Sequence, residues 1–110
     1  MKLLVVGSNP LVRRMVLNVV ADLASDIREC ASAAEAIAAY AGDSPDFVLA
    51  DADGMQVARR IIDAHPEARV IVLGDYDDPD LRAQAFQAGA SHYVLKDDMF
   101  SLIGLMQSLS

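Results

Sequence analysis

The chain has 110 residues, of which 54% are hydrophobic and 23% charged, so it is large enough for one domain with its own core and too apolar for a disordered segment. A net charge of −7 argues against direct binding of this domain to the phosphate backbone of a nucleic acid. Its one cysteine, Cys30, excludes a disulfide framework and a cysteine zinc cluster, and we expect it to be a buried apolar residue.

Short apolar runs alternate with amphipathic stretches along the whole chain. This alternation is typical of a parallel sheet with helices on both faces. The expected strands, in chain order, are Lys2–Val6, Ile27–Ala31, Asp46–Ala50, Arg69–Leu73 and His92–Leu95. The pattern therefore predicts five strands, each followed by a helix, in one α/β domain.

Capping residues mark where the first two helices begin. Asn9 and Pro10 have the N-cap and N1 chemistry of a helix that we expect to run to about Ala24. The segment 32–35, Ser-Ala-Ala-Glu, has the spacing of a capping box and begins an alanine-rich helix that reaches about Ala41.

The last three helices have similar signals. The third is expected over 55–65, because Pro66 disfavours helical geometry in the residue before it. Asp78 is the expected N-cap of the fourth helix, and Gly89 ends that helix. The fifth, begun by a capping aspartate after the last strand, reaches about Leu109.

Charged residues follow two of the expected strands. Asp51 comes directly after the third strand and Lys96 after the fifth, whereas the first strand is followed by Gly7 and Ser8. The carboxyl ends of parallel strands converge on the crevice where open α/β sheets bind ligands. We therefore expect one acid and one base of a phosphate-type site, without the carboxylates that would hold a metal ion.

Four stretches of the sequence are similar to one known family. They are VGSNPLVRR at 6–14, PDFVLAD at 45–51, HPEARVIVLGDYDDP at 65–79 and AGASHYVLKDD at 88–98. Together they resemble the receiver domain of bacterial two-component response regulators, in the branch that precedes LuxR/NarL-type DNA-binding domains. The resemblance spans nearly the whole chain. It implies one receiver-like domain over residues 1–110 with the flavodoxin-like (βα)5 fold, a doubly wound five-stranded parallel sheet of strand order 2-1-3-4-5.

The resemblance also implies roles for individual residues. Asp51 matches the aspartate that accepts a phosphoryl group from a histidine kinase, and Lys96 matches the lysine that pairs with the phosphoryl oxygens. Tyr93 matches the aromatic residue whose rotamer reports the switch. Gly74 stands where the family has a Thr or Ser whose hydroxyl follows the phosphoryl group.

The acidic pocket of the family is degenerate in this sequence. Gly7 and Ser8 stand where the family has two acids that bind Mg²⁺, and the loop after Asp51 is about five residues shorter than usual, so that Asp53 comes early. Losing one carboxylate beside the ion costs about 2–4 kcal/mol at an effective dielectric constant near 20. We therefore expect weak or absent Mg²⁺ binding, no metal site and no other cofactor.

These features predict an atypical receiver, not an enzyme, that signals through protein contacts independently of ordinary phosphorylation. Its expected partners are a histidine kinase or an effector domain, such as a LuxR-type DNA-binding domain, and a second copy in a homodimer. Two alternatives remain open: a conventional receiver phosphorylated on Asp51, and a ligand-sensing receiver. No apolar run approaches the ~20 residues of a membrane span, and Met1 leads almost directly into a strand, so we expect a cytoplasmic protein.

Each of these residues also has a purely structural interpretation. Asp51 can cap the following helix, Lys96 can form an ordinary salt bridge with Asp51, and Tyr93 can be a half-buried aromatic residue. The acids of 75–80 are explained by the dipole of the helix that follows them. The segment 47–55 also resembles the nucleophile motif of haloacid-dehalogenase-type phosphatases. In that fold, however, the lysine precedes a Gly-Asp motif, whereas here Lys96 follows Gly74 and Asp75.

Overall fold

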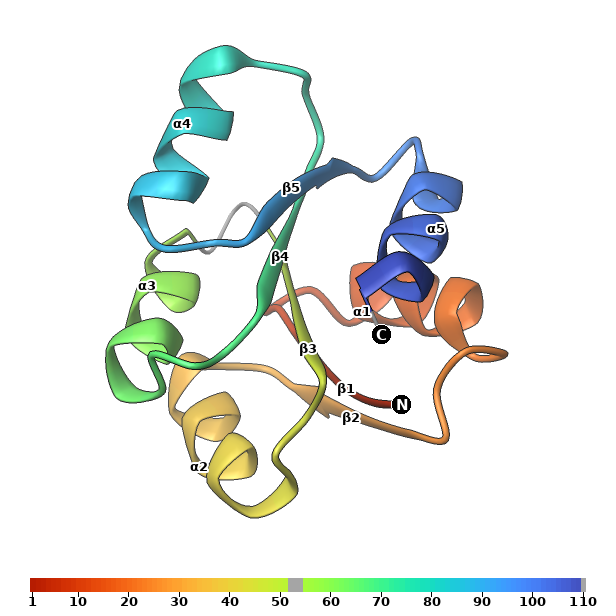
Figure 1. Cartoon of the computed structure of the whole chain (residues 1–110), viewed down its shortest axis with the longest axis vertical. Helices are drawn as coiled ribbons and strands as arrows, with labels where there is room; N and C mark the ends of the chain where they lie inside the picture. Colours follow the sequence, from red (N-terminus) through yellow and green to blue (C-terminus); the bar gives the residue numbers. More distant parts are fainter. Residues whose placement is uncertain (52–54, 110) are drawn as a thin grey trace.

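Five parallel strands form the centre of the molecule. The computed structural model describes residues 1–51 and 55–109. Its strands are β1 (Lys2–Val6), β2 (Asp26–Cys30), β3 (Phe47–Asp51), β4 (Val70–Gly74) and β5 (His92–Leu95). Their order in the sheet is β2-β1-β3-β4-β5, as Figure 1 shows. The predicted strand order and the flavodoxin-like fold are therefore confirmed.

A helix follows each strand and covers one face of the sheet. The helices are α1 (Pro10–Val20), α2 (Ala33–Asp43), α3 (Met55–Ala64), α4 (Pro79–Gln87) and α5 (Met99–Leu109). In Figure 1, α1 and α5 lie on one face, and α2, α3 and α4 lie on the other. Among the described residues, no helix is both long enough and apolar enough to cross a membrane.

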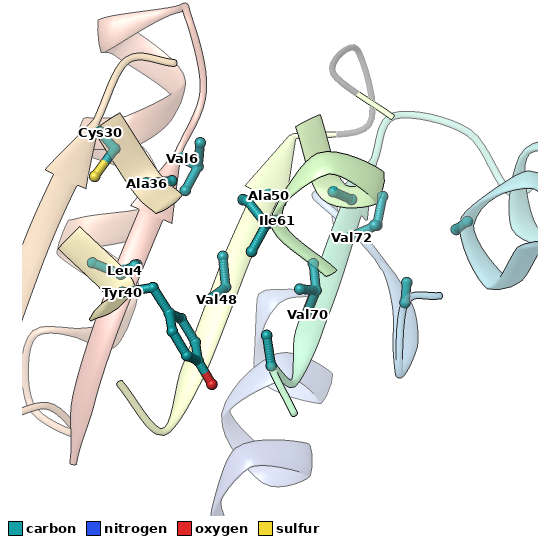
Figure 2. Close-up of a cluster of buried hydrophobic side chains, with 14 of the residues drawn as sticks. Leu4, Val6, Cys30, Ala36, Tyr40, Val48, Ala50, Ile61, Val70 and Val72 are labelled. Atoms are coloured by element: carbon teal, nitrogen blue, oxygen red, sulfur yellow. The ribbon is translucent and has the colours of Figure 1, made fainter. Parts of the chain in front are cut away.

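The sheet has a hydrophobic core on each face, because successive residues of a strand point to opposite sides. The core under α2, α3 and α4 includes the strand residues Leu4, Val6, Val48, Ala50, Val70 and Val72 (Figure 2). The core under α1 and α5 includes Leu3, Val5, Leu49, Ile71 and Leu73. Cys30 is buried in the first core, as predicted. Because both faces are covered, the sheet itself can present polar side chains to a ligand at the ends of its strands.

The predicted helix caps are confirmed. The side chains of Asn9, Ser32 and Asp78 each accept a hydrogen bond from a backbone N–H in the first turn of their helix. Gly89, just beyond α4, has a φ of 100°, a conformation that glycine adopts without steric cost. These caps fix where α1, α2 and α4 begin, close to the carboxyl ends of the strands that precede them.

Two helix ends differ from the prediction. Helix α1 ends at Val20 and not at Ala24, because the Val20 carbonyl accepts hydrogen bonds from the backbone N–H groups of both Leu23 and Ala24 and so closes a turn. Helix α2 continues past Ala41 to Asp43, and the next residue, with a φ of 47°, closes it in the left-handed conformation.

The ends of three strands differ by one residue from the prediction, and two of these differences affect the candidate site. β2 begins and ends one residue earlier than predicted, whereas β3 and β4 begin and end one residue later. The shifts bring Asp51 and Gly74 into the sheet, where Asp51 pairs with Leu73 and Gly74 pairs with Leu95. Both residues are thus held by regular strand pairing and are not part of a loop.

Candidate functional site

The carboxyl ends of β3 and β5 bring an acid and a base together. Lys96 Nζ donates a hydrogen bond to Asp51 Oδ1 over 2.9 Å. The two side chains are only 10% and 9% exposed, so this ion pair is largely shielded from water. Such a pair is stronger than a surface salt bridge, because solvent screens it less. The structure thus places the two residues that the sequence singled out in direct contact.

A second carboxylate lies on the same lysine. Asp75, the first residue after β4, has its Oδ1 3.2 Å from Lys96 Nζ, and its side chain is 49% exposed. The backbone N–H of Lys96 donates to the Gly74 carbonyl over 2.8 Å, which keeps the end of β5 beside the end of β4. Lys96 therefore joins two strand ends through two carboxylates.

The charge state of Lys96 follows from these contacts. Burial by itself would lower its pKa, because a low dielectric disfavours the ammonium ion. Hydrogen bonds and Coulomb attraction from Asp51 and Asp75 act in the opposite direction and prevail, so the pKa of Lys96 lies above its ordinary value. Lys96 is consequently a permanent cation at physiological pH.

The ring of Tyr93 fills the space beside Gly74. Tyr93 is 6% exposed, and its hydroxyl donates to the backbone carbonyl of Tyr76 over 2.8 Å. A Cβ added at Gly74 would overlap the Tyr93 hydroxyl and would lie only 2.9 Å from Cε2 of the ring. The side chain of a Thr or Ser at position 74 is therefore incompatible with this position of Tyr93.

Arg82 also contacts the ring of Tyr93. The guanidinium carbon of Arg82 lies 5.1 Å from the centroid of the Tyr93 ring, within the range of a cation–π interaction. Arg82 Nη2 also pairs with Asp77 Oδ1 at 2.9 Å. Burial raises the pKa of the Tyr93 hydroxyl, and nearby aspartates, Asp75 first among them, raise it further against the lowering effect of Arg82. Tyr93 therefore stays a neutral hydrogen-bond donor at physiological pH.

Position 7, at the end of β1, faces Asp51 directly. A Cβ added at Gly7 would lie 3.5 Å from the Asp51 Cβ, an ordinary van der Waals distance. The Gly7 carbonyl accepts a short hydrogen bond from Arg13 Nη1, and Arg13 Nε pairs with Glu29 Oε1 at 3.2 Å. Gly7 therefore lies beside Asp51 without a carboxylate, and its backbone carbonyl is held by a guanidinium.

Of the two remaining predicted pocket residues, the structure describes one. Ser8 is exposed at the surface. Asp53 lies outside the described residues. A small cavity bordered by Gly7, Arg13 and Asp51 has a volume of about 10 Å³, which is close to the space that one water molecule needs.

The described donor set does not fit a Mg²⁺ ion, which the resemblance implies for this site. Mg²⁺ requires octahedral oxygen ligation that normally includes one or two carboxylates. Among residues 1–51 and 55–109, no three His, Cys, Asp or Glu side chains are grouped so that they could hold a metal ion. The Asp51 carboxylate is bound by the Lys96 ammonium, and Gly7 supplies none.

Sequence reasoning missed the role of the segment just after β4. Asp75 was explained by the dipole of α4, yet it contacts Lys96, and Tyr76 contributes the carbonyl that binds Tyr93. The signal that could have revealed Asp75 is its position at a strand end. It was hidden because β4 was predicted to stop one residue early, at Leu73.

Comparisons with known proteins show what this chain is similar to. The family model described as the response regulator receiver domain matches residues 3–107. The transcriptional regulatory protein YhcZ of Bacillus subtilis is 37% identical over 76 residues, which are 64% of this chain and 36% of that protein. The transcriptional activator DevR/DosR of Mycobacterium tuberculosis is 32% identical over 103 residues, which are 87% of this chain and 48% of that protein.

A solved structure extends the similarity to the fold as a whole. The crystal structure of a LuxR-family two-component response regulator from an Aurantimonas species superimposes with a TM-score of 0.85 at 26% identity. The match covers 98% of this chain and 83% of that one. The chain spans less than half the length of the two curated relatives, which carry further sequence beyond the matched region.

Proposed function

The chain belongs to the response regulator receiver domain family, and we propose that it is an atypical member, which signals through protein contacts without depending on ordinary phosphorylation of Asp51. One observation carries this proposal. The position that faces Asp51 from β1 is a glycine, whose added Cβ would lie 3.5 Å from the Asp51 Cβ. A carboxylate there would point to the phosphoacceptor position, and this chain lacks it.

The missing carboxylate matters because of how phosphoryl transfer is catalysed. The protein positions the groups, and Mg²⁺ neutralises charge on the transferring oxygens. Losing one carboxylate beside the ion costs about 2–4 kcal/mol, which corresponds to a roughly thirtyfold to thousandfold loss of metal affinity. At such affinities Mg²⁺ would rarely be bound, and phosphorylation of Asp51 would be slow.

The proposed partners are proteins. YhcZ and DevR/DosR are named as transcriptional regulators, and the Aurantimonas structure is of the LuxR family. We therefore propose that this domain controls a LuxR-type DNA-binding domain in a longer cytoplasmic protein and is not itself an enzyme. The surface of α4, β5 and α5 is the proposed site of contact with an effector domain or with a second copy.

A conventional phosphoacceptor receiver is the second candidate. The observation that favours it is the 2.9 Å contact between Asp51 and Lys96, which provides the acid and the base that such a site needs. A ligand-sensing receiver has less support, because the described cavity beside Asp51 has room for about one water molecule.

A phosphorylation assay separates the first two candidates. The protein is incubated with acetyl phosphate and Mg²⁺, and intact-mass spectrometry measures the fraction that gains one phosphoryl group. We expect a negligible fraction in the wild type and the same in the Asp51→Asn control. The variant with Gly7→Asp and Ser8→Asp is the positive arm, in which we expect Mg²⁺-dependent modification. Extensive modification of the wild type that is absent in Asp51→Asn would overturn the proposal and establish the conventional receiver.

A further inference from the structure

The loop between β4 and α4, residues Asp75–Asp78, is attached to the end of β5 at two consecutive residues. Asp75 is bound through its carboxylate to Lys96 Nζ, and Tyr76 is bound through its backbone carbonyl to the Tyr93 hydroxyl. Both β5 partners are largely buried, with Lys96 10% and Tyr93 6% exposed. Both contacts are made by groups that belong to the chain itself.

The glycine at position 74 is explained by space and not by backbone conformation. Gly74 belongs to β4, pairs with Leu95 in regular parallel register and does not have a positive φ. A glycine within a strand weakens that strand and often marks a place where another group approaches closely. Here that group is the Tyr93 ring, which would overlap any side chain at position 74. The glycine thus allows Tyr93 to remain buried beside β4.

Asp75 occupies the place on Lys96 that an anionic ligand would take. The lysine ammonium has three donors, and carboxylate oxygens of Asp51 and Asp75 lie 2.9 and 3.2 Å from it. A phosphoryl group on Asp51 would bring further negative charge into the same space and would repel the Asp75 carboxylate. The positive charge of Lys96 is therefore already engaged by an anion that belongs to the chain.

We infer that Asp75 is a built-in substitute for the phosphoryl group: its carboxylate on Lys96, together with Tyr93 packed on Gly74, holds the Asp75–Asp78 loop in one position while Asp51 is unphosphorylated. This inference rests on the proposed function, because it explains how an unphosphorylated receiver presents a constant surface. In that state the β4–α4 loop and the start of α4 have one arrangement, and partner binding through them needs no phosphoryl group.

Hydrogen exchange on the wild type and on Asp75→Asn tests the ionic half of this inference. The probes are the backbone N–H groups of Arg82 and Lys96, which donate to carbonyls of Asp78 and Gly74 at the two ends of the loop. We expect Asp75→Asn to increase both exchange rates by about fivefold, the factor for the loss of one partly buried ion pair.

The matched control is Asp97→Asn, which removes the same charge from an exposed residue next to Lys96 in the sequence. Equal exchange in the Asp75 and Asp97 variants would overturn the assignment of Asp75. This outcome is distinguishable from failure of the proposed function, because exchange is measured without a phosphodonor. The exchange test can fail for Asp75 while the phosphorylation assay still finds Asp51 unmodified. Conversely, the exchange test can succeed while the assay finds Asp51 phosphorylated.

A double-mutant cycle tests the packing half. Gly74→Thr in the wild type should lower the melting temperature markedly, since the new side chain displaces the Tyr93 ring. In a Tyr93→Ala background the space is open, and the same substitution should lower the melting temperature by less than half as much or raise it, because Thr favours strands. An equal decrease in both backgrounds would contradict the packing. If Gly74→Thr alone does not fold, recovery of folding in the double variant supports the packing, and failure to recover contradicts it.

Discussion

The space between Gly74 and Tyr93 has room for the side chain of only one of the two residues. The ring of Tyr93 takes that space, its hydroxyl donates to the Tyr76 carbonyl, and Arg82 lies over the ring. A hydroxyl-bearing residue at position 74 would have to expel the ring. At this position, therefore, the absence of a side chain and the buried position of the aromatic ring depend on each other, and the two residues have to be interpreted together.

The hydroxyl of Tyr93 gives a first prediction. Tyr93→Phe keeps the ring but removes the donor to the Tyr76 carbonyl, so we expect the free energy of unfolding to fall by about 1 kcal/mol, the usual net worth of one hydrogen bond. Urea denaturation measures it. Tyr76→Phe is the control, because Tyr76 is 71% exposed and acts through its backbone, so its change should stay within about 0.5 kcal/mol. Equal losses in both variants would refute the role of the hydroxyl.

Alkaline pH provides a second prediction at the residue scale. Burial raises the pKa values of Cys30, Tyr40 and Tyr93. Two carboxylates raise the pKa of Lys96 despite its burial. The unfolded chain releases these protons at its ordinary pKa values, about 9 for the thiol and about 10 for the other groups, while the folded chain still holds them. The free energy of unfolding is therefore nearly constant between about pH 7 and 8 and decreases as the pH rises above about 9.

Urea denaturation at a series of pH values between about 8 and 11 measures this decrease. Tyr93→Phe removes one of these four titrating groups, so its curve should fall less steeply than that of the wild type. A wild-type stability that stays level or rises above about pH 10 would contradict the environments described for these side chains.

At the scale of the elements, the helix caps decide how each helix leaves the sheet. Asn9 directs α1 away from the end of β1, where its side chain accepts a hydrogen bond from the Leu11 N–H over 2.9 Å. Helix α1 has no acidic residue in its first turn and no basic residue in its last turn, so its dipole is not compensated by charges at those places. The cap is for this reason the main local stabilisation of its first turn.

Removing that cap is the third prediction. Asn9→Ala should lower the free energy of unfolding by about 1 kcal/mol, because a donor at the beginning of α1 loses its partner. The same substitution at Asn18, an exposed position inside α1, serves as the control and should be neutral or slightly stabilising, since alanine favours helices. Thermal denaturation of both variants checks this, and a loss at Asn18 equal to that at Asn9 would show that the cap is not the cause.

Element order and caps could be predicted from the sequence, whereas exact strand ends could not. Apolar runs show which residues are buried, but Asp51 and Gly74 belong to the sheet through pairing with Leu73 and Leu95 on neighbouring strands. Such pairing depends on register between distant segments, and a one-residue error moves a side chain to the other face. The same error concealed Asp75 as a ligand of Lys96.

The candidate site was only partly predictable, for a related reason. Strand ends indicated that Asp51 and Lys96 would meet, and they lie 2.9 Å apart. The contact of Tyr93 with Gly74 depends on which rotamer the ring adopts, and local sequence does not determine that. Compact packing does, because the space beside a strand glycine is filled by whichever large neighbour can reach it.

For the molecule as a whole, the described structure combines a common receiver fold with a strand-end site whose charges are already paired. Lys96 is engaged by two carboxylates, and the position facing Asp51 is a glycine. The chain spans less than half of the curated relatives that it matches, so the proposed control of a DNA-binding domain has to be tested in the protein as it occurs in the cell. The central claim is that this control does not need a phosphoryl group on Asp51.

The most direct measurement compares wild type and Asp51→Asn in cells. A strain lacking the gene is complemented with each full-length version, and the transcripts that change on deletion are quantified. Lys96 keeps Asp75 as a partner, so Asp51→Asn should lower the free energy of unfolding by only about 1–2 kcal/mol and leave the domain folded. We expect both versions to restore the transcripts equally. Failure of a folded Asp51→Asn protein to restore them would contradict the account and show that Asp51 phosphorylation is required.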